Sequence, residues 1–110
     1  MQPEISLVLV SYNMTAQLRR TLMSLAPAYQ RNCPPGRCEV IVVDNGSAVA
    51  PTLEEIATPG LDITLHAWRD APHSPVPALN FGIAQATAPI IAVWIDAARL
   101  ATPGLIEAYL

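Results

Sequence analysis

Three short runs in this sequence are apolar at almost every position, and they constrain the fold more than any other feature. They cover residues 5–10, 39–43 and 90–95, and β-branched residues and leucine dominate them. Such runs suit strands of a sheet that is covered on both faces, which usually means parallel strands in an α/β fold. A fourth run, residues 61–68, alternates apolar and polar residues. Alternation of this kind predicts a half-exposed strand at an edge of the sheet.

Helical patterns separate the apolar runs. In residues 15–26, Leu18, Leu22 and Leu25 fall on one helix face, with Asn13 or Thr15 as the expected N-cap. Residues 79–88 form a second amphipathic pattern.

Two shorter helices complete the pattern. One begins near Pro51 and stops at residues 58–60, and the last begins at Thr102–Pro103, with the threonine as its cap. The order β-α-β-α-β-α-β-α predicts a Rossmann-like parallel sheet with helices on both faces, formed by residues 1–110 as a single α/β domain.

Composition narrows the range of partners. Apolar residues make up 52% of the chain, which excludes a disordered chain. Six basic against nine acidic residues leave a net charge of −3, so nucleic acid and anionic membranes are not expected partners.

Location and thiol chemistry follow from the same sequence. No secretory signal and no apolar run near the ~20 residues of a membrane helix are present, so a cytoplasmic protein is expected. Cys33 and Cys38 flank a turn-rich loop in which their thiols could form a bridge, but two reduced thiols are the expected state.

Polar residues follow the buried strands where each one ends. Ser11 and Tyr12 follow the first, Asp44 begins an Asp-Asn-Gly-Ser sequence after the second, and Asp96 follows the run at 90–95. In parallel α/β sheets, ligands bind outside the carboxyl ends of the strands, so these residues are expected to share one crevice. The structural alternative is that Ser11 and Asn13 only cap a helix and that residues 44–47 only form a turn.

The ligand chemistry is narrowed by the motifs that are missing. The sequence contains no Gly-x-Gly-x-x-Gly, no Gly-x-x-x-x-Gly-Lys-Ser/Thr and no Gly-x-Ser-x-Gly. Acidic side chains at the strand ends instead suit hydroxyls, base N–H groups or a bridging cation.

Taken together, four segments resemble family 2 glycosyltransferases of the GT-A fold. They are residues 5–13, residues 39–47 with their Asp-x-Gly-Ser turn, the Asn80-Phe81-Gly82 helix, and residues 90–96, which lead to that family's Asp-x-Asp motif. The resemblance implies strand order 3-2-1-4 and identifies the chain as the N-terminal donor-binding half of such a domain.

The resemblance also implies roles for individual residues. Ser11 and Tyr12 would flank the nucleotide base, Asp44 would accept a hydrogen bond from it, and Asp96 would lie near the ribose and a metal-bridged diphosphate. The reaction implied is transfer of a sugar, with inversion, from a nucleoside diphosphate sugar to an acceptor hydroxyl.

The sequence departs from the family pattern beside Asp96. Ala98 stands where the second aspartate is expected and offers no oxygen to a metal, which leaves binding of Mn²⁺ or Mg²⁺ by Asp96 open. Arg99 could replace the cation by pairing with the diphosphate, or it could be a solvated residue or a partner of Glu107.

The length of the chain limits what it is expected to do alone. The resemblance covers the donor-binding half and includes no position for a catalytic base, so we expect the 110-residue chain alone to be inactive. The alternative function is a non-catalytic nucleotide-binding or interaction module of the same fold. In strand order 3-2-1-4 the run 90–95 is an apolar edge, which predicts self-association through that strand.

Overall fold

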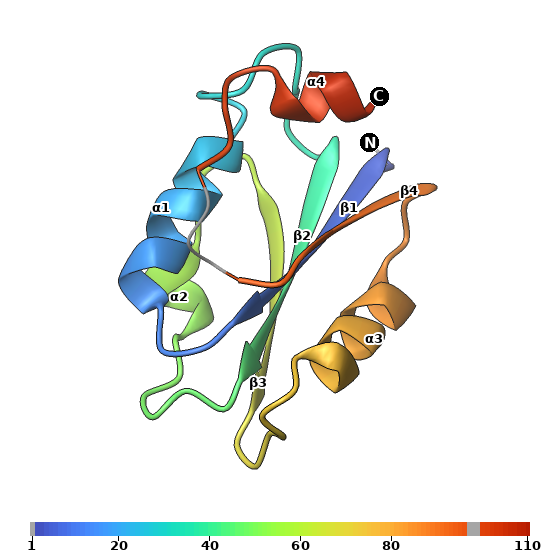
Figure 1. Ribbon diagram of the computed structural model, residues 1–110. Coiled ribbons are helices and arrows are strands. Elements are labelled where there is room, and N and C mark those ends of the chain that lie inside the picture. Colours follow the sequence, from blue (N-terminus) through green and yellow to red (C-terminus); the bar gives the residue numbers. More distant parts are fainter. Residues whose placement is uncertain (1, 97–99) are drawn as a thin grey trace.

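The computed structural model describes residues 2–96 and 100–110 as a sheet with helices against both of its faces (Figure 1). In chain order the elements are β1 (Ile5–Ser11), α1 (Thr15–Leu25), β2 (Cys38–Asn45), α2 (Leu53–Ile56), β3 (Asp62–Trp68), α3 (Val76–Gln85), β4 (Ile90–Trp94) and α4 (Leu105–Tyr109).

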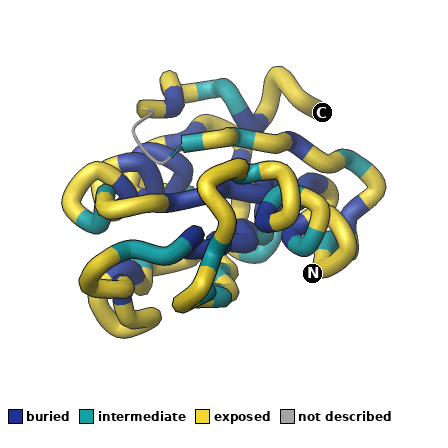
Figure 2. The backbone as a smooth tube through the Cα atoms, turned by 60° about the horizontal axis from the view of Figure 1, so that its bottom comes forward, coloured by how far each residue is buried: buried dark blue, intermediate teal, exposed yellow. Residues whose placement is uncertain are grey.

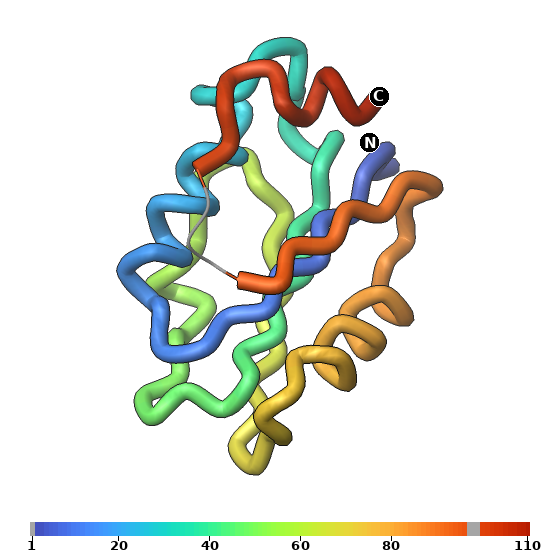
Figure 3. Tube along the Cα trace, in the orientation of Figure 1, coloured from blue at the N-terminus to red at the C-terminus, as the bar shows by residue number. Residues whose placement is uncertain are grey.

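The sheet has four parallel strands in the order β3-β2-β1-β4. Ile5 lies opposite Cys38 on one side and Ile90 on the other, so the three central strands start level with one another. The α/β class and the strand order expected from the sequence are confirmed. The carboxyl ends of all four strands lie at one edge of the sheet, and the traced chain brings both termini to the opposite end (Figure 3).

Each face of the sheet has its own apolar core. On one face, Leu18, Leu22 and Leu25 of α1 are fully buried together with residues of α2 and α4, which confirms the helix face expected from their spacing. On the other face, α3 packs over β1 and β2. There Gly82 approaches so closely that a Cβ atom built on it would lie 2.3 Å from Val8 Cγ1.

The two edge strands differ in burial (Figure 2). Along β3 most residues are exposed or half-buried, as the alternating pattern predicts. In β4 the side chain of Ala92 is buried on the α1 face, whereas Ile91 and Val93 on the α3 face remain 42% and 40% exposed.

The prediction that Asn13 or Thr15 is the N-cap of α1 is wrong. Met14 occupies the N-cap position and makes no side-chain cap hydrogen bond. Asn13 adopts a left-handed backbone with φ of 50°, and its side-chain oxygen accepts from the Ala48 N–H at 2.8 Å. The Asn13 side chain therefore contacts a residue that is distant in sequence and does not cap the helix.

The prediction that Thr102 is the N-cap of α4 is also wrong. Gly104, with φ of 96°, occupies its N-cap position in place of Thr102. The other two expected starts are shifted. Thr52 caps α2 in a capping box with Glu55, one residue after Pro51, and α3 begins at Val76, before the expected residue 79.

The segment that contains α4 is attached to the core through the side chain of Gln30, which is only 5% exposed. Its amide nitrogen donates to the carbonyls of Ser24 (2.7 Å) and Thr102 (2.9 Å). Its oxygen accepts from the N–H groups of Gly104 and Ile106, both at 3.2 Å. One side chain therefore makes four hydrogen bonds that join residues 102–106 to the end of α1.

A carboxylate network closes the amino-terminal edge of the sheet. Ser6 Oγ donates to Glu39, as do the N–H (2.8 Å) and the hydroxyl (2.7 Å) of Thr87. Burial by itself would raise the pKa of Glu39, but these hydrogen bonds and one from the Ala88 backbone outweigh it, so the net pKa lies below the usual value.

This network predicts a stability loss in acid. Because the folded-state pKa of Glu39 is lowered, its contribution is present above the unfolded pKa of about 4.3 and is lost as pH falls through the folded value. We expect the difference in urea midpoint between the wild type and Glu39→Gln to be largest at pH 7 and to shrink below about pH 4. Glu54→Gln, on the exposed surface of α2, is the control. An unchanged difference at about pH 3 would show that Glu39 acts by packing alone.

Two further sequence-based expectations concern membranes and cysteines. No helix in the described ranges is long and apolar enough to cross a membrane. Cys33 and Cys38 are free and buried, and burial raises the pKa of Cys38 to about 12.

Candidate functional site

The carboxyl ends of β1, β2 and β4 lie at one edge of the sheet, as expected, but their polar side chains divide between its two faces. Successive residues of a strand point to opposite faces. Ser11 and Asp44 are register partners that continue the α1 side of the sheet, whereas Asn45 continues the α3 side.

A cleft of about 220 Å³ opens at this edge near the start of α3. It brings together two of the residues expected from the sequence, Tyr12 and Asp96. Ser11 and Asp44 are not among its lining residues. The cleft is lined by Val10, Tyr12, Met14, Asn45, His73, Pro75, Ile95 and Asp96.

The side chain of Asp44 holds a turn. It is fully buried, and its two oxygens accept from the N–H (3.1 Å) and the hydroxyl (2.6 Å) of Ser47. Ser47 Oγ in turn accepts from the backbone N–H of Asn13 at 2.7 Å. These contacts tie the loop after β2 to the loop after β1, so Asp44 holds the two loops together and does not itself line the cleft. The Ser11 hydroxyl is buried, with no partner in residues 2–96 or 100–110.

The structure adds Asn45 to the site. This residue is 8% exposed and lines the cleft. Its amide nitrogen donates to the Pro72 carbonyl at 3.1 Å, which fixes the amide plane, and its oxygen finds no partner within the described part of the chain. A buried carbonyl oxygen without a donor is costly, and a bound N–H group would satisfy it. The sequence signal for this position was the Asp-Asn-Gly-Ser segment. Its first residue, Asp44, was the expected site residue, whereas its second residue, Asn45, is the one that lines the cleft.

The loop between β3 and α3 forms one wall of the cleft and contributes His73. It packs closely on the β2 turn, since a Cβ on Gly46, whose φ is 86°, would lie 3.2 Å from that of Ala71. The Asn45–Pro72 hydrogen bond fastens the same loop. This loop therefore borders the cleft.

Asp96 is half-buried and lines the cleft, whereas Ala97, Ala98 and Arg99 lie outside the described residues, and with them the expected contact of Arg99. No group of three or more His, Cys, Asp or Glu suited to a metal ion occurs within residues 2–96 and 100–110. One carboxylate is nevertheless enough for a cation that also binds substrate phosphates, so Asp96 fits such an ion.

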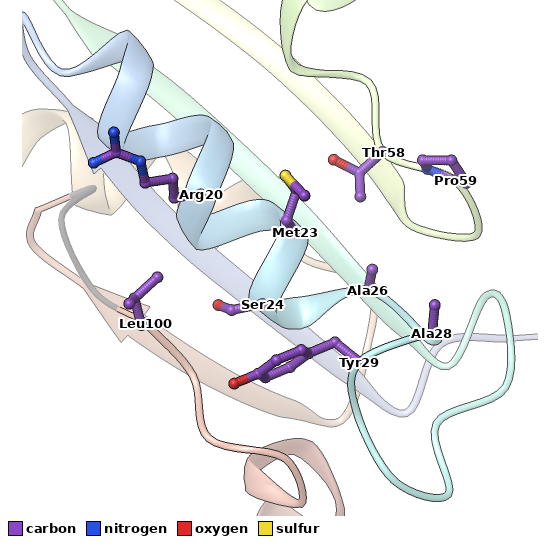
Figure 4. A pocket seen from close by; sticks show the side chains of 9 residues that line it. All are labelled: Arg20, Met23, Ser24, Ala26, Ala28, Tyr29, Thr58, Pro59 and Leu100. Atoms are coloured by element: carbon purple, nitrogen blue, oxygen red, sulfur yellow. The ribbon is translucent and has the colours of Figure 1, made fainter.

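A larger hollow, about 550 Å³, lies on the outer side of α1 (Figure 4). Met23, Tyr29 and Leu100 expose apolar surface there, and Arg20 is the single charged residue among those that line it. Its lining residues include no carboxylate, imidazole or thiol, whereas the strand-end cleft is lined by Asp96 and His73.

Comparison with known proteins decides the family. The family model described as "Glycosyl transferase family 2" matches residues 6–109. The chain belongs to glycosyltransferase family 2. No curated protein matches the sequence.

Solved structures share the fold of this family 2 chain. Staphylococcus aureus TarS 1–349 superposes with a TM-score of 0.80 at 23% identity, over 98% of this chain and 31% of that one. The mannosyltransferase PcManGT from Pyrobaculum calidifontis, in complex with GDP-Man and Mn²⁺, gives a TM-score of 0.70 at 25% identity, over 91% of this chain and 29% of that one. The strand order matches the GT-A fold, and the family 2 chain spans less than a third of either structure.

Proposed function

We propose that the strand-end cleft binds the nucleotide of a nucleoside diphosphate sugar, and that the chain is the donor-binding part of an inverting glycosyltransferase. The observation that carries the proposal is Asn45, which lines the cleft together with Tyr12 and Asp96 and whose buried side-chain oxygen has no partner in the described part of the chain. Membership of the family and the GDP-Man complex of the mannosyltransferase support it.

Each cleft residue has a distinct role in this proposal. Tyr12, 57% exposed, offers a ring against which the base can stack. Asn45 accepts a hydrogen bond from a base N–H, because its amide nitrogen is oriented toward the Pro72 carbonyl and its oxygen has no donor among the described residues. Asp96 faces the ribose and diphosphate, and it is the residue that would hold a divalent cation such as Mn²⁺ or Mg²⁺, which stabilises the charge of the leaving diphosphate.

Sugar transfer also requires a carboxylate base that deprotonates the acceptor hydroxyl. No described residue is assigned that role. Direct contact of Ser11 or Asp44 with the nucleotide stays a prediction. Self-association through residues 90–95 also stays a prediction.

A calorimetric titration with UDP- and GDP-sugars, with and without Mn²⁺, tests the proposal. Binding that needs the metal supports the transferase, and binding without it supports the alternative, a non-catalytic module that has lost the metal site. No binding of either nucleotide would contradict both.

Asn45→Ala is expected to weaken nucleotide binding about tenfold, because a hydrogen bond to the base contributes about 1.5 kcal/mol. Ser11→Ala tests the other predicted position of the base, on the α1 side of the sheet. It removes another unpartnered buried oxygen, but one outside the cleft. Equal affinities of wild type and Asn45→Ala would contradict the role of Asn45, and a loss on Ser11→Ala alone would place the base on the α1 side of the sheet.

A further inference from the structure

The backbone turns sharply at Asn13, directly after the cleft residue Tyr12. Asn13 has a φ of 50°, and among the described residues other than glycine only Asn32, with a φ of 49°, shares a positive φ. A left-handed backbone is unfavourable for residues with a side chain, although asparagine tolerates it better than most. Such conformations persist where the surrounding structure holds them, and they cluster at ligand-binding sites.

Two hydrogen bonds hold Asn13 in this conformation, and both come from the turn after β2. The backbone N–H of Asn13 donates to Ser47 Oγ at 2.7 Å, and its side-chain oxygen accepts from the Ala48 N–H at 2.8 Å. Ser47 Oγ is itself fixed, because it donates to the buried carboxylate of Asp44 at 2.6 Å. Asn13 is therefore bound through both its backbone and its side chain to a turn that is anchored in the sheet.

The residues on either side of Asn13 line the cleft, whereas Asn13 itself does not. Tyr12 and Met14 both contribute to the cleft wall. The Tyr12 side chain is exposed, and no contact with another aromatic ring holds it within the described residues. The direction in which the Tyr12 ring projects is therefore set mainly by the backbone at residues 12 and 13.

We propose that Asn13 is a positioning residue for nucleotide binding, a role that rests on the proposed function of the cleft. Held by Ser47 and Ala48, Asn13 directs the ring of Tyr12 against the base. Neither Asn13 nor Ser47 lines the cleft, so both act on the ligand through Tyr12. A ring that is placed before the ligand arrives binds more tightly, because less conformational freedom is lost on binding.

Calorimetric titration with UDP and with GDP, each in the presence of Mn²⁺, tests the proposal. Asn13→Gly keeps the left-handed backbone accessible but removes the acceptor of the Ala48 N–H. We expect it to weaken nucleotide binding about fivefold, the effect of one neutral hydrogen bond on the population of the placed ring. Asn32→Gly is the matched control, because Asn32 has the same backbone conformation outside the cleft, and it should bind like the wild type. Equal affinities of Asn13→Gly and the wild type would overturn the proposal.

Two substitutions of Ser47 separate its hydroxyl from the rest of its side chain. Ser47→Ala removes the oxygen that joins Asn13 to Asp44, whereas Ser47→Thr keeps it. Binding is expected to weaken about fivefold for Ser47→Ala and to stay at the wild-type level for Ser47→Thr. The same affinity for both variants would count against the role of this hydroxyl.

A double-mutant cycle shows whether Asn13 acts through Tyr12. Tyr12→Ala alone should weaken binding about tenfold, because it removes a ring on which the base stacks. In the Tyr12→Ala background, Asn13→Gly is expected to have no further effect on affinity. A residue that only supports the fold would keep its full effect in that background, and such a result would overturn the proposal.

The ¹⁹F resonance of 3-fluorotyrosine at position 12 tests the same role without a ligand, with Tyr12→Phe to assign it. Asn13→Gly is expected to shift this resonance toward that of free fluorotyrosine, and Asn32→Gly is expected to leave it unchanged. An unchanged resonance in Asn13→Gly would overturn the proposal even where the wild type binds a nucleotide. If the wild type binds neither UDP nor GDP, the proposed function fails, and the resonance still decides whether Asn13 places the ring of Tyr12.

Discussion

Gly82→Ala is expected to lower the free energy of unfolding by about 1–3 kcal/mol, the usual cost of overpacking a core. The added methyl group would lie 2.3 Å from Val8 Cγ1, so α3 must move away from β1 or the valine must leave its rotamer. In an exposed helix the same substitution stabilises by about 1 kcal/mol, because alanine is the better helix former. The sign of the effect therefore reports the close approach of helix and sheet.

Urea unfolding of a double-mutant cycle measures the energetic effect of this close approach. Val8→Ala removes the methyl groups that the new Cβ would meet, so Gly82→Ala should cost less in that background than in the wild type. Ala84→Gly, at an exposed position of α3, controls for helix propensity alone. A stabilising Gly82→Ala in the wild-type background would show that α3 has room above β1.

Gln30→Ala is expected to destabilise the chain by about 2–3 kcal/mol. The substitution leaves the N–H of Ile106 buried without an acceptor and removes three further hydrogen bonds, and an unsatisfied buried group costs about 1–3 kcal/mol. The segment 100–110 loses its attachment to α1 first, because Gln30 provides much of it.

Two measurements separate this effect from general destabilisation. The urea midpoint should fall for Gln30→Ala and stay unchanged for Gln17→Ala, whose side chain is exposed on α1. Hydrogen exchange should quicken at Gly104 and Ile106 before it quickens in β1. Uniform acceleration over the whole chain would show that Gln30 supports the core as a whole and not this segment.

Local patterns predicted the secondary structure well where burial sets the pattern. The uninterrupted apolar run of residues 5–10 became the fully buried β1, and the Leu18, Leu22 and Leu25 spacing became the inner face of α1. The helix starts were less predictable. Asn13 looks like a cap by residue type, yet its side chain bonds to Ala48, which is distant in sequence.

The candidate site shows the same division. The sequence placed polar residues at the carboxyl ends of the strands, and the structure confirms that shared edge. Which of two adjacent residues faces the cleft depends on strand parity and on the loop that covers the edge. Asp44 and Asn45 differ by one position, so one holds the turn with Ser47 and the other lines the cleft beside Pro72.

The sequence by itself therefore determined the α/β class, the strand order through the family resemblance, and the edge of the sheet where a ligand could bind. Apolar periodicity is a local property, because burial of one face of a helix or strand fixes the spacing of its apolar residues. It can therefore be recognised in the sequence without knowledge of the fold. Only the tertiary structure decided that Asn45 lines the cleft, that Gln30 holds the segment containing α4, and that Gly82 touches Val8. Those contacts join residues far apart in the chain, and a single side chain takes whichever partner the packed elements bring within hydrogen-bonding or van der Waals distance.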